Sequence, residues 1–272
     1  MNPLISFIGG GNMARALASG LLRNNHPANR LCVSDPNIEA REQFAALGVC
    51  VLSDNDQAVT DADIIVLAVK PQSLAAVAGG LASSLRPEQL VISIAAGVRI
   101  DTLRRWLGGH GRIVRAMPNT PALVQAGATG LYAPDEVSED ERALAESLLR
   151  AVGVCVWVSS EALLDSVTAL SGSGPAYAFL VMEAMQAAGE KLGLDTATAR
   201  LLTLETLFGA ARLALESNEE PATLRARVTS PGGTTERGIA ALEQAGLVAA
   251  FEHALEAARA RAEELATLMD QA

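Results

Sequence analysis

The chain has 272 residues, half of them apolar, which is long enough for one large or two medium domains, and two are expected. Its 21 basic and 31 acidic residues give a formal net charge of −10 without a basic cluster, which argues against nucleic acid or an anionic membrane as a partner. No stretch approaches the ~20 apolar residues of a membrane span, and no basic region precedes the first apolar run, so a cytoplasmic protein is expected.

The first elements predict a nucleotide-binding turn. A short β-rich run at residues 4–8 ends in three glycines, and residues 12–23 continue at helical spacing. The glycine turn matches G-x-G-x-x-A between a strand and a helix, which is the context that the dinucleotide motif requires. Gly9 permits the tight turn, Gly11 lets the backbone approach a pyrophosphate, and Ala14 lets the helix lie close to the sheet. The cofactor contacts predicted in this segment are Ile8, Gly9, Gly11, Asn12, Met13 and Ala14.

Strand and helix patterns alternate through the first 160 residues. Further strands are predicted at 31–34, 48–51, 64–69, 90–94, 112–117, 128–132 and 154–158, and helices at 39–47 and 138–151. The continuous apolar runs at 64–69 and 90–94 indicate central strands buried on both faces. The alternation predicts an α/β domain over residues 1–160 with a Rossmann-like, doubly wound sheet.

The residues after the second predicted strand leave the choice between NADH and NADPH open. They stand about 20 to 25 residues beyond the glycine turn, where the adenosine ribose is recognised. Asp35 would accept hydrogen bonds from a ribose hydroxyl and repel a 2′-phosphate, whereas Ser34 would donate to that phosphate, with Arg41 near enough in sequence to help. A turn or helix cap before Pro36 is the alternative role of Asp35.

The chain after Ser159 predicts an all-helical domain over residues 161–272, because Ala, Leu, Glu and Arg at helical spacing replace the β-branched runs. The predicted helices span 161–170, 175–191, 196–216, 221–228, 234–244 and 247–269. The helix at 175–191 is apolar on more than one face, and so small a bundle covers such a helix poorly. The sequence therefore predicts a homodimer in which helices of two chains intertwine.

A turn rich in glycine and hydroxyl groups, residues 229–236, interrupts the helical half. Pro231 suits the start of a helix, the glycines let the backbone approach a ligand closely, and the hydroxyls of Ser230, Thr234 and Thr235 can cap a helix or donate hydrogen bonds. The turn is either an ordinary helix N-terminus or an anion site built from free N–H groups.

The cysteines and histidines favour neither a disulfide framework nor a metal site. Cys32, Cys50 and Cys155 are odd in number and lack C-x-x-C spacing, so buried free thiols are expected. The histidines stand far apart and form no H-x-x-x-H pair, so no metal site is predicted.

Six motifs, taken together, resemble those of the pyrroline-5-carboxylate reductase family. They are G-G-G-N-M-A at residues 9–14, A-V-K-P at 68–71, A-A-G-V at 95–98, M-P-N-T-P at 117–121, L-S-G-S-G-P-A-Y at 170–177 and S-P-G-G-T-T at 230–235. The resemblance covers essentially the whole chain. It implies reduction of the C=N bond of 1-pyrroline-5-carboxylate to L-proline by NADPH, with NADH as the alternative. It also implies a homodimer, which some relatives assemble into a ring of dimers such as a decamer.

The resemblance also implies roles for individual residues. Thr235 would hydrogen-bond the substrate nitrogen, and Ser230 shares the catalytic site with it. The implied substrate contacts are Gly233, Thr234, Lys70 and Asn119. The implied cofactor contacts beyond the glycine turn are Ser34, Asp35, Asn55, Ala68, Val69, Lys70, Ala95, Ala96, Gly97, Pro118 and Asn119. A solvated lysine is the alternative for Lys70, and a helix cap is the alternative for Asn55.

Two other functions are compatible with a nucleotide domain joined to helices. A 3-hydroxyacid dehydrogenase normally carries its catalytic lysine in a K-x-x-x-N segment, whereas Lys191 is followed four residues later by Asp195. A non-catalytic NADPH-binding sensor would need the glycine turn but not the turn at 230–235. The sequence therefore disfavours both.

Overall fold

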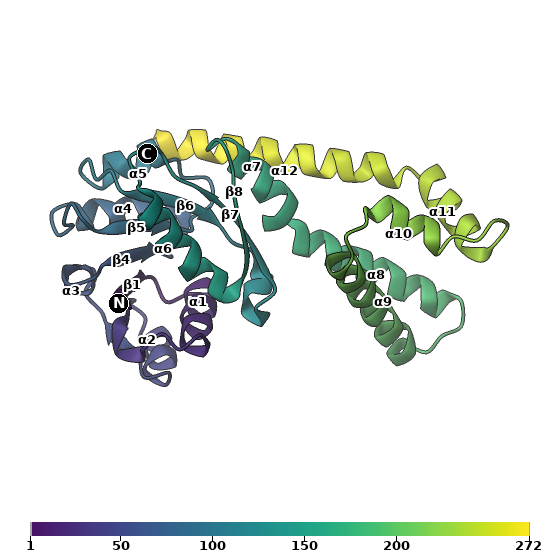
Figure 1. The fold of residues 1–272 in the computed structure, drawn as a ribbon, viewed down its shortest axis with the longest axis horizontal. Helices are drawn as coiled ribbons and strands as arrows, with labels where there is room; N and C mark the ends of the chain where they lie inside the picture. The colour runs from purple at the N-terminus through teal and green to yellow at the C-terminus, as the bar shows by residue number, and fades with distance from the viewer. Residues whose placement is uncertain (1, 272) are drawn as a thin grey trace. The chain divides into compact units, whose positions relative to one another are not determined.

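The computed structural model describes residues 2–271 and contains an eight-stranded sheet, shown with the helices in Figure 1. The strands are β1 (Ile5–Ile8), β2 (Leu31–Ser34), β3 (Cys50–Leu52), β4 (Ile64–Leu67), β5 (Leu90–Ser93), β6 (Ile113–Met117), β7 (Gly127–Tyr132) and β8 (Gly153–Trp157). Their order is β3-β2-β1-β4-β5-β6-β7-β8, and all neighbours are parallel except β6 and β7. The order reverses between β1 and β4, and ligands of such sheets bind at the carboxyl ends of the strands beside this point.

Helices cover both faces of the sheet, which confirms the doubly wound fold. Alternate residues of β4 belong to two hydrophobic cores, one on each face of the sheet, because successive side chains of a strand point to opposite faces. Ile64 and Val66 pack with side chains of α1 (Asn12–Arg23), α2 (Ile38–Ala45) and α6 (Glu139–Leu149). Ile65 and Leu67 pack with α3 (Asn55–Thr60), α4 (Pro71–Leu81) and α5 (Ile100–Trp106).

Local chemistry explains where several of these helices begin. Ser138 and Glu141 form a capping box at the start of α6, in which each side chain accepts a hydrogen bond from the other residue's backbone N–H. The helices α3, α4 and α5 have no counterpart among the predicted ranges. The helix α3 is short, and Gly79 and Gly80 weaken the helical pattern of α4.

Two predicted elements differ from the structure. The strand expected at 48–51 begins only at Cys50, because Gly48 has a φ of +76°, which is incompatible with a strand. The helix expected at 161–170 is divided into α7 (Leu163–Val167) and a π-helical turn, Thr168–Gly172. Short 3₁₀ turns lie at Ala28–Arg30, Thr120–Val124 and Arg150–Val152.

The remaining helices lie close to their predicted ranges. They are α8 (Gly174–Lys191), α9 (Thr196–Glu216), α10 (Pro221–Arg227), α11 (Thr234–Gln244) and α12 (Leu247–Asp270). Asp195 caps α9 by accepting a hydrogen bond from the N–H of Thr198 at 3.0 Å. Within residues 2–271, no helix is both long enough and apolar enough to cross a bilayer.

The chain forms two compact units. The sheet unit comprises residues up to Ser173 and those from Ala257 onward, and the helical unit is Gly174–Glu256. This division differs from the boundary expected after residue 160, because the carboxyl-terminal part of α12 packs with the sheet unit. Ala266 is 2% exposed, and Asp270 accepts hydrogen bonds from the side chains of Thr102 and Arg105.

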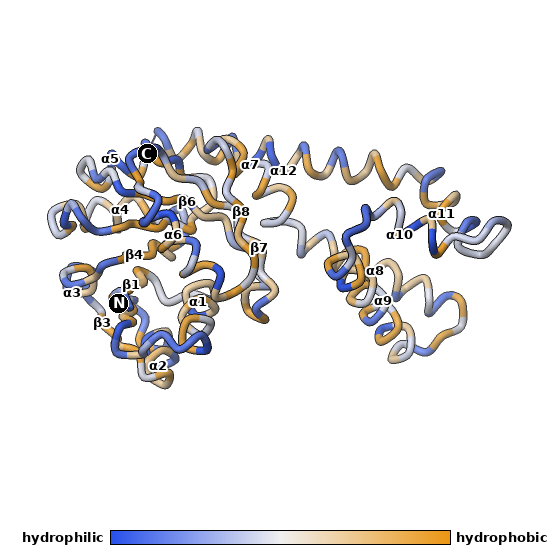
Figure 2. The backbone as a smooth tube through the Cα atoms, viewed as in Figure 1, coloured by the Kyte–Doolittle hydropathy of each residue, from blue (hydrophilic) through white to orange (hydrophobic). Residues whose placement is uncertain are grey.

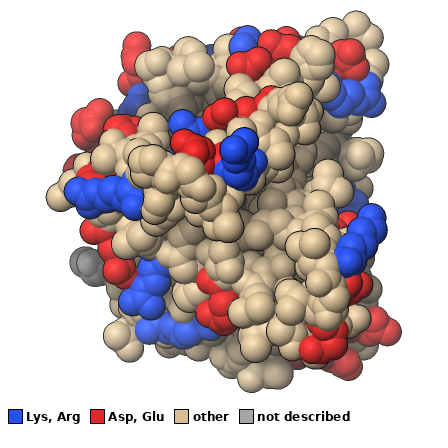
Figure 3. Space-filling model, turned by 90° about the vertical axis from the view of Figure 1, so that its right-hand side faces the viewer, with Lys and Arg blue, Asp and Glu red and all other residues tan. Residues whose placement is uncertain are grey.

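The helical unit exposes many large apolar side chains. Figure 2 shows hydrophobic residues along the strands of the sheet and also along α8 and α9. In the single chain no residue of α8 is buried, and Phe179 and Phe208 are 58% and 62% exposed. On the face drawn in Figure 3, charged side chains lie near the middle as well as around the edge, with uncharged surface between them. Apolar surface on this scale is typical of a protein interface.

Candidate active site

The glycine turn between β1 and α1 has the geometry of a pyrophosphate cradle. Gly9 has a φ of +101°, and a Cβ there would lie 2.8 Å from the carbonyl oxygen of Ala68. A Cβ on Gly11 would meet no atom within 4 Å, so the backbone here borders open space. The helix α1 begins at Asn12, and no side chain caps it. Free N–H groups and the helix dipole attract an anion, so this turn fits the pyrophosphate of a dinucleotide.

Asp35 follows β2 and uses both carboxylate oxygens in backbone hydrogen bonds. Its Oδ2 accepts from the N–H of Gly10 at 2.7 Å, and its Oδ1 accepts from the N–H of Asn37 at 2.8 Å. These bonds give Asp35 the turn-capping role considered above and tie the end of β2 to the glycine turn. Its predicted contact with the cofactor ribose stays a prediction.

Ser34 and Asn55 meet at the same end of the sheet. The Ser34 hydroxyl, buried at the end of β2, donates to Oδ1 of Asn55 at 2.7 Å. Asp54 caps α3 by accepting from two backbone N–H groups of that helix, so the alternative role of Asn55 as a helix cap is wrong. The Nδ2 of Asn55 has no hydrogen-bond partner among the described residues, and it remains a donor for a ligand.

The loops after β4 and β5 carry the next predicted cofactor contacts. Ala68 and Val69 are half-buried, whereas Lys70 is exposed where α4 begins. After β5, Gly97 has a φ of +72°, and a Cβ there would lie 3.3 Å from Cβ of Leu265. Ala96 and Gly97 line a cavity of about 300 Å³ together with side chains of α12. The structure therefore places these loops along the carboxyl edge of the parallel strands, as predicted from their position after each strand.

Asn119 follows β6 and has a bonded side chain. Its Nδ2 donates to the carbonyl oxygen of Ser171 at 3.0 Å, and its Oδ1 accepts from the N–H of Ala128 at 2.9 Å. The side chain thus joins the loop after β6, which contains the buried Pro118, to the π-helical turn. Its contacts with substrate or cofactor stay predictions.

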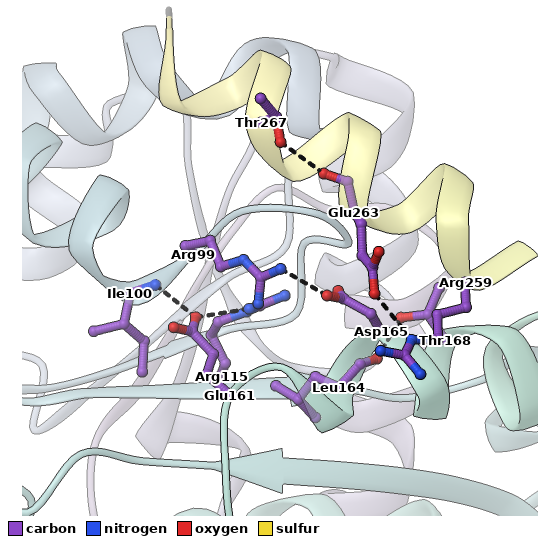
Figure 4. Close-up of polar contacts among 10 residues, drawn as sticks. All are labelled: Arg99, Ile100, Arg115, Glu161, Leu164, Asp165, Thr168, Arg259, Glu263 and Thr267. Carbon is purple, nitrogen blue, oxygen red and sulfur yellow. Dashed lines mark hydrogen bonds and ion pairs between the residues drawn. The ribbon is translucent and has the colours of Figure 1, made fainter.

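Two partly buried ion pairs hold α7 and the residues before it against the sheet, as Figure 4 shows. The side chain of Arg115, 5% exposed on β6, donates to Oε1 of Glu161 at 2.7 Å, and the same oxygen accepts from the N–H of Ile100 at 2.7 Å. Arg99 donates to Oδ2 of Asp165 at 2.7 Å. Arg99 and Ile100 follow the loop at 95–97, so these bonds anchor the chain directly after this predicted cofactor loop.

These ion pairs were not predicted, although one signal for them is present in the sequence. Arg115 lies in the strand sequence I-V-R-A-M, where its neighbours are buried. A buried guanidinium requires a carboxylate or several carbonyl oxygens as partners. The partner itself, 46 residues away in sequence, is set by the fold alone.

In the helical unit, the turn at 230–235 is held by two hydrogen bonds of its own. The N–H of Gly232, which has a φ of +73°, donates to Oε2 of Glu236 at 2.7 Å. The N–H of Gly233 donates to the carbonyl oxygen of Ser230 at 3.0 Å. Glu236 was not among the predicted site residues, and its position on the first turn of α11 is the signal for this role.

The donors of this turn are available to a ligand. The side chains of Ser230, Thr234 and Thr235 are exposed in the single chain, and their hydroxyls have no hydrogen-bond partner among residues 2–271. The helix α11 begins at Thr234 after Gly233, and no side chain caps it. These hydroxyls therefore do not form the ordinary helix cap, and the turn can accept an anion.

The three thiols differ in exposure. Cys32 and Cys155 are buried, whereas Cys50 is exposed on the edge strand β3, so its predicted burial was wrong. Burial, reinforced by the neighbouring Cys50, raises the pKa of the Cys32 thiol to about 12, and burial raises the pKa of Cys155 to about 11.

We expect one rapidly reacting thiol per native chain with Ellman's reagent at pH 8, because only thiolates attack this disulfide and two of the thiols are held protonated. The Cys50→Ser variant should lose the rapid phase, and denaturant should expose the remaining thiols. A rapid phase that persists in Cys50→Ser would contradict this assignment.

The sheet topology, the open glycine turn and the loops at the carboxyl edge define the class of protein: one that binds a dinucleotide at a Rossmann-like sheet. Residues 4–97 match the family model "NADP oxidoreductase coenzyme F420-dependent", and residues 161–265 match "Pyrroline-5-carboxylate reductase dimerisation". A pyrroline-5-carboxylate reductase from Pseudomonas aeruginosa is 52% identical over 270 residues, which cover 99% of each chain. The chain therefore belongs to the pyrroline-5-carboxylate reductase family.

Solved structures agree over the full length. A pyrroline-5-carboxylate reductase from Coxiella burnetii has a TM-score of 0.93 at 50% identity, covering 97% of this chain and 99% of that one. The Plasmodium falciparum pyrroline carboxylate reductase with NADP bound has a TM-score of 0.87 at 30% identity, covering 97% and 98%. The resemblance inferred from six motifs is confirmed, as is NADP as the cofactor of the family.

Proposed function

We propose that this protein is a pyrroline-5-carboxylate reductase, which uses NADPH to reduce the C=N bond of 1-pyrroline-5-carboxylate in the last step of proline biosynthesis. The observation that supports this most directly is the turn at 230–235, whose hydroxyls are unpaired among the described residues in a chain that matches the family along its whole length. The cytoplasm is the compartment we propose for this activity.

In the proposed mechanism, different residues of the turn bind the carboxylate and the ring nitrogen of the substrate. NADPH, when bound, supplies the hydride for the C=N carbon. Ser230 and Thr234 bind the substrate carboxylate through hydroxyl and N–H groups, which fixes the ring for hydride transfer. Gly233, whose N–H donates to the carbonyl oxygen of Ser230, lets the carboxylate approach the backbone closely. The Thr235 hydroxyl hydrogen-bonds the ring nitrogen. Threonine is a poor acid, so the nitrogen proton comes from water or is already present on the substrate as an iminium.

Oxidation of NADPH, followed at 340 nm with two substrates, tests the proposal. Turnover with 1-pyrroline-5-carboxylate and formation of proline are expected, without turnover of a 3-oxo acid. Turnover of the 3-oxo acid alone would favour a 3-hydroxyacid dehydrogenase. NADPH binding without turnover of either compound would favour a sensor.

We also propose a homodimer whose helical units intertwine, with a ring of dimers as its extension. Support comes from the matched dimerisation model and from α8, which has no buried residue in the single chain. Covering Phe179 and Phe208 in a dimer would remove the exposed part of two large apolar side chains from water, each contributing about 1–2 kcal/mol because they are 58% and 62% exposed.

Sedimentation velocity tests the dimer. The wild-type chain is expected to sediment as a dimer or a multiple of it, and the Phe179→Asp/Phe208→Asp variant should shift toward the monomer because charges are costly in an apolar interface. Val154→Asp is the control, since Val154 is 59% exposed on β8 in the sheet unit. A monomeric wild-type chain would overturn the proposal.

A further inference from the structure

Cys32 and Cys50 lie side by side on neighbouring strands. They are partners in the register of the parallel pair β2 and β3, so their side chains point to the same face of the sheet. Neighbouring strands lie about 4.7–4.9 Å apart, and the two Cα atoms of a disulfide lie about 4.4–6.8 Å apart. The backbone therefore holds the two thiols at a spacing that a disulfide can bridge.

The strand that carries Cys50 can adjust to such a bond. β3 has three residues and stands at the edge of the sheet, so another strand holds it on one side only. It follows a turn in which Gly48 has a φ of +76°. Local motion costs least where few buried contacts hold a segment. The edge strand can therefore approach β2 while the buried strands of the sheet stay in place.

The two thiols differ in exposure, which suits them to different parts of a thiol–disulfide exchange. Cys50 is exposed to reagents in solution, whereas Cys32 is 7% exposed and belongs to the core that contains Ala58 and Val59. Burial, reinforced by the neighbouring Cys50, raises the pKa of the Cys32 thiol to about 12, so its direct reaction with a dissolved reagent is slow. Its attack on a sulfur already bonded to Cys50 is intramolecular, and proximity favours such a step.

The third thiol is too distant to compete for this bond within the chain. Cys155 lies on β8, and β3 and β8 are the two opposite edges of the eight-stranded sheet. Its Sγ lies 3.9 Å from the carbonyl oxygen of Glu146, to which it donates. Cys155 is therefore a matched control for a buried thiol outside the pair.

We propose that Cys32 and Cys50 form a reversible redox site that reacts with low-molecular-weight disulfides such as oxidised glutathione. Cys50 loses its proton to solvent and attacks one sulfur of the small disulfide, which forms a mixed disulfide and releases one thiolate. Cys32 then loses its proton and attacks the sulfur of Cys50, which releases the second thiolate. Two electrons pass to the small disulfide, which becomes two thiols, and the chain gains one internal disulfide. This site is independent of the proposed reductase activity.

Ellman's reagent, itself a small disulfide, tests the site in the native enzyme. After the single rapid phase, a slower second thionitrobenzoate should leave each chain, and the mass of the chain should fall by that of two hydrogen atoms. Peptide mapping without reduction should join the peptides that contain Cys32 and Cys50. Oxidised glutathione should give the same product, and dithiothreitol should restore the starting mass.

Two variants identify the thiol that makes the second attack. Cys32→Ala should release one thionitrobenzoate and retain the other as a stable adduct on Cys50, because the resolving thiol is absent. Cys155→Ser, the matched control, should give the wild-type product. A wild-type chain that retains the adduct on Cys50, or a disulfide that joins two chains or includes Cys155, would overturn the inference.

Discussion

A Thr235→Ala variant is expected to reduce 1-pyrroline-5-carboxylate about 10- to 1,000-fold more slowly than the wild-type enzyme, with nearly unchanged affinity for NADPH. The hydroxyl is exposed on the first turn of α11 and has no partner among the described residues, so its loss breaks no hydrogen bond of the folded chain. The loss should therefore fall on kcat, because the proposed contact with the ring nitrogen strengthens as hydride transfer changes that atom. NADPH oxidation and quenching of NADPH fluorescence measure the two quantities.

Two further variants distinguish an effect on catalysis from an effect on the folding of this turn. Thr235→Ser keeps a hydroxyl at the position and should recover most of the rate. Thr229→Ala removes a hydroxyl that donates to the carbonyl oxygen of Arg225 at 2.6 Å, outside the proposed contacts, and should have a small effect on turnover. Unchanged turnover in Thr235→Ala would remove this residue from the proposed mechanism.

Glu161→Ala should lower the free energy of unfolding by about 3–5 kcal/mol, the usual cost of removing one partner of a buried pair. The variant leaves the guanidinium of Arg115 and the N–H of Ile100 without the oxygen that both now share. The Arg115 side chain is 5% exposed, so water can replace the lost carboxylate only in part. Urea unfolding at fixed protein concentration, followed by circular dichroism, measures the change.

Glu263→Ala is the control for this loss. Glu263 pairs with Arg259 at 2.9 Å on the surface of α12, where an exposed pair contributes under about 1 kcal/mol. Replacing both Arg115 and Glu161 with apolar residues should recover much of the stability lost in Glu161→Ala. An equal, small loss in Glu161→Ala and Glu263→Ala would show that the buried pair contributes little.

The parts of the fold that were predictable depend on local patterns. The helix α9 begins and ends at its predicted residues because Asp195 caps a long run of helix formers. The strand β4 was recognised because a continuous apolar run must be buried on both faces. The glycine turn was recognisable because the motif and its flanking elements agree.

The parts that were not predictable depend on contacts distant in sequence. The acid that pairs with Arg115 is chosen by the packing of α7, and no pattern near either residue encodes it. Cys50 and Cys32 are neighbours in the register of β3 and β2, yet only the edge position of β3 exposes one of them. The hydrogen bond from Gly232 to Glu236 depends on the exact backbone path of a glycine turn.

The position of α12 in the sequence determines when the sheet unit can complete its packing during synthesis. Ala262, Ala266 and Asp270 belong to the sheet unit, although they follow the whole helical unit in sequence. Because domains made on the ribosome fold from the amino terminus onward, the nucleotide-binding sheet emerges first but lacks its final helix. Its packing is completed only after α12 has been synthesised, so a chain interrupted before α12 lacks part of the packing of its sheet unit.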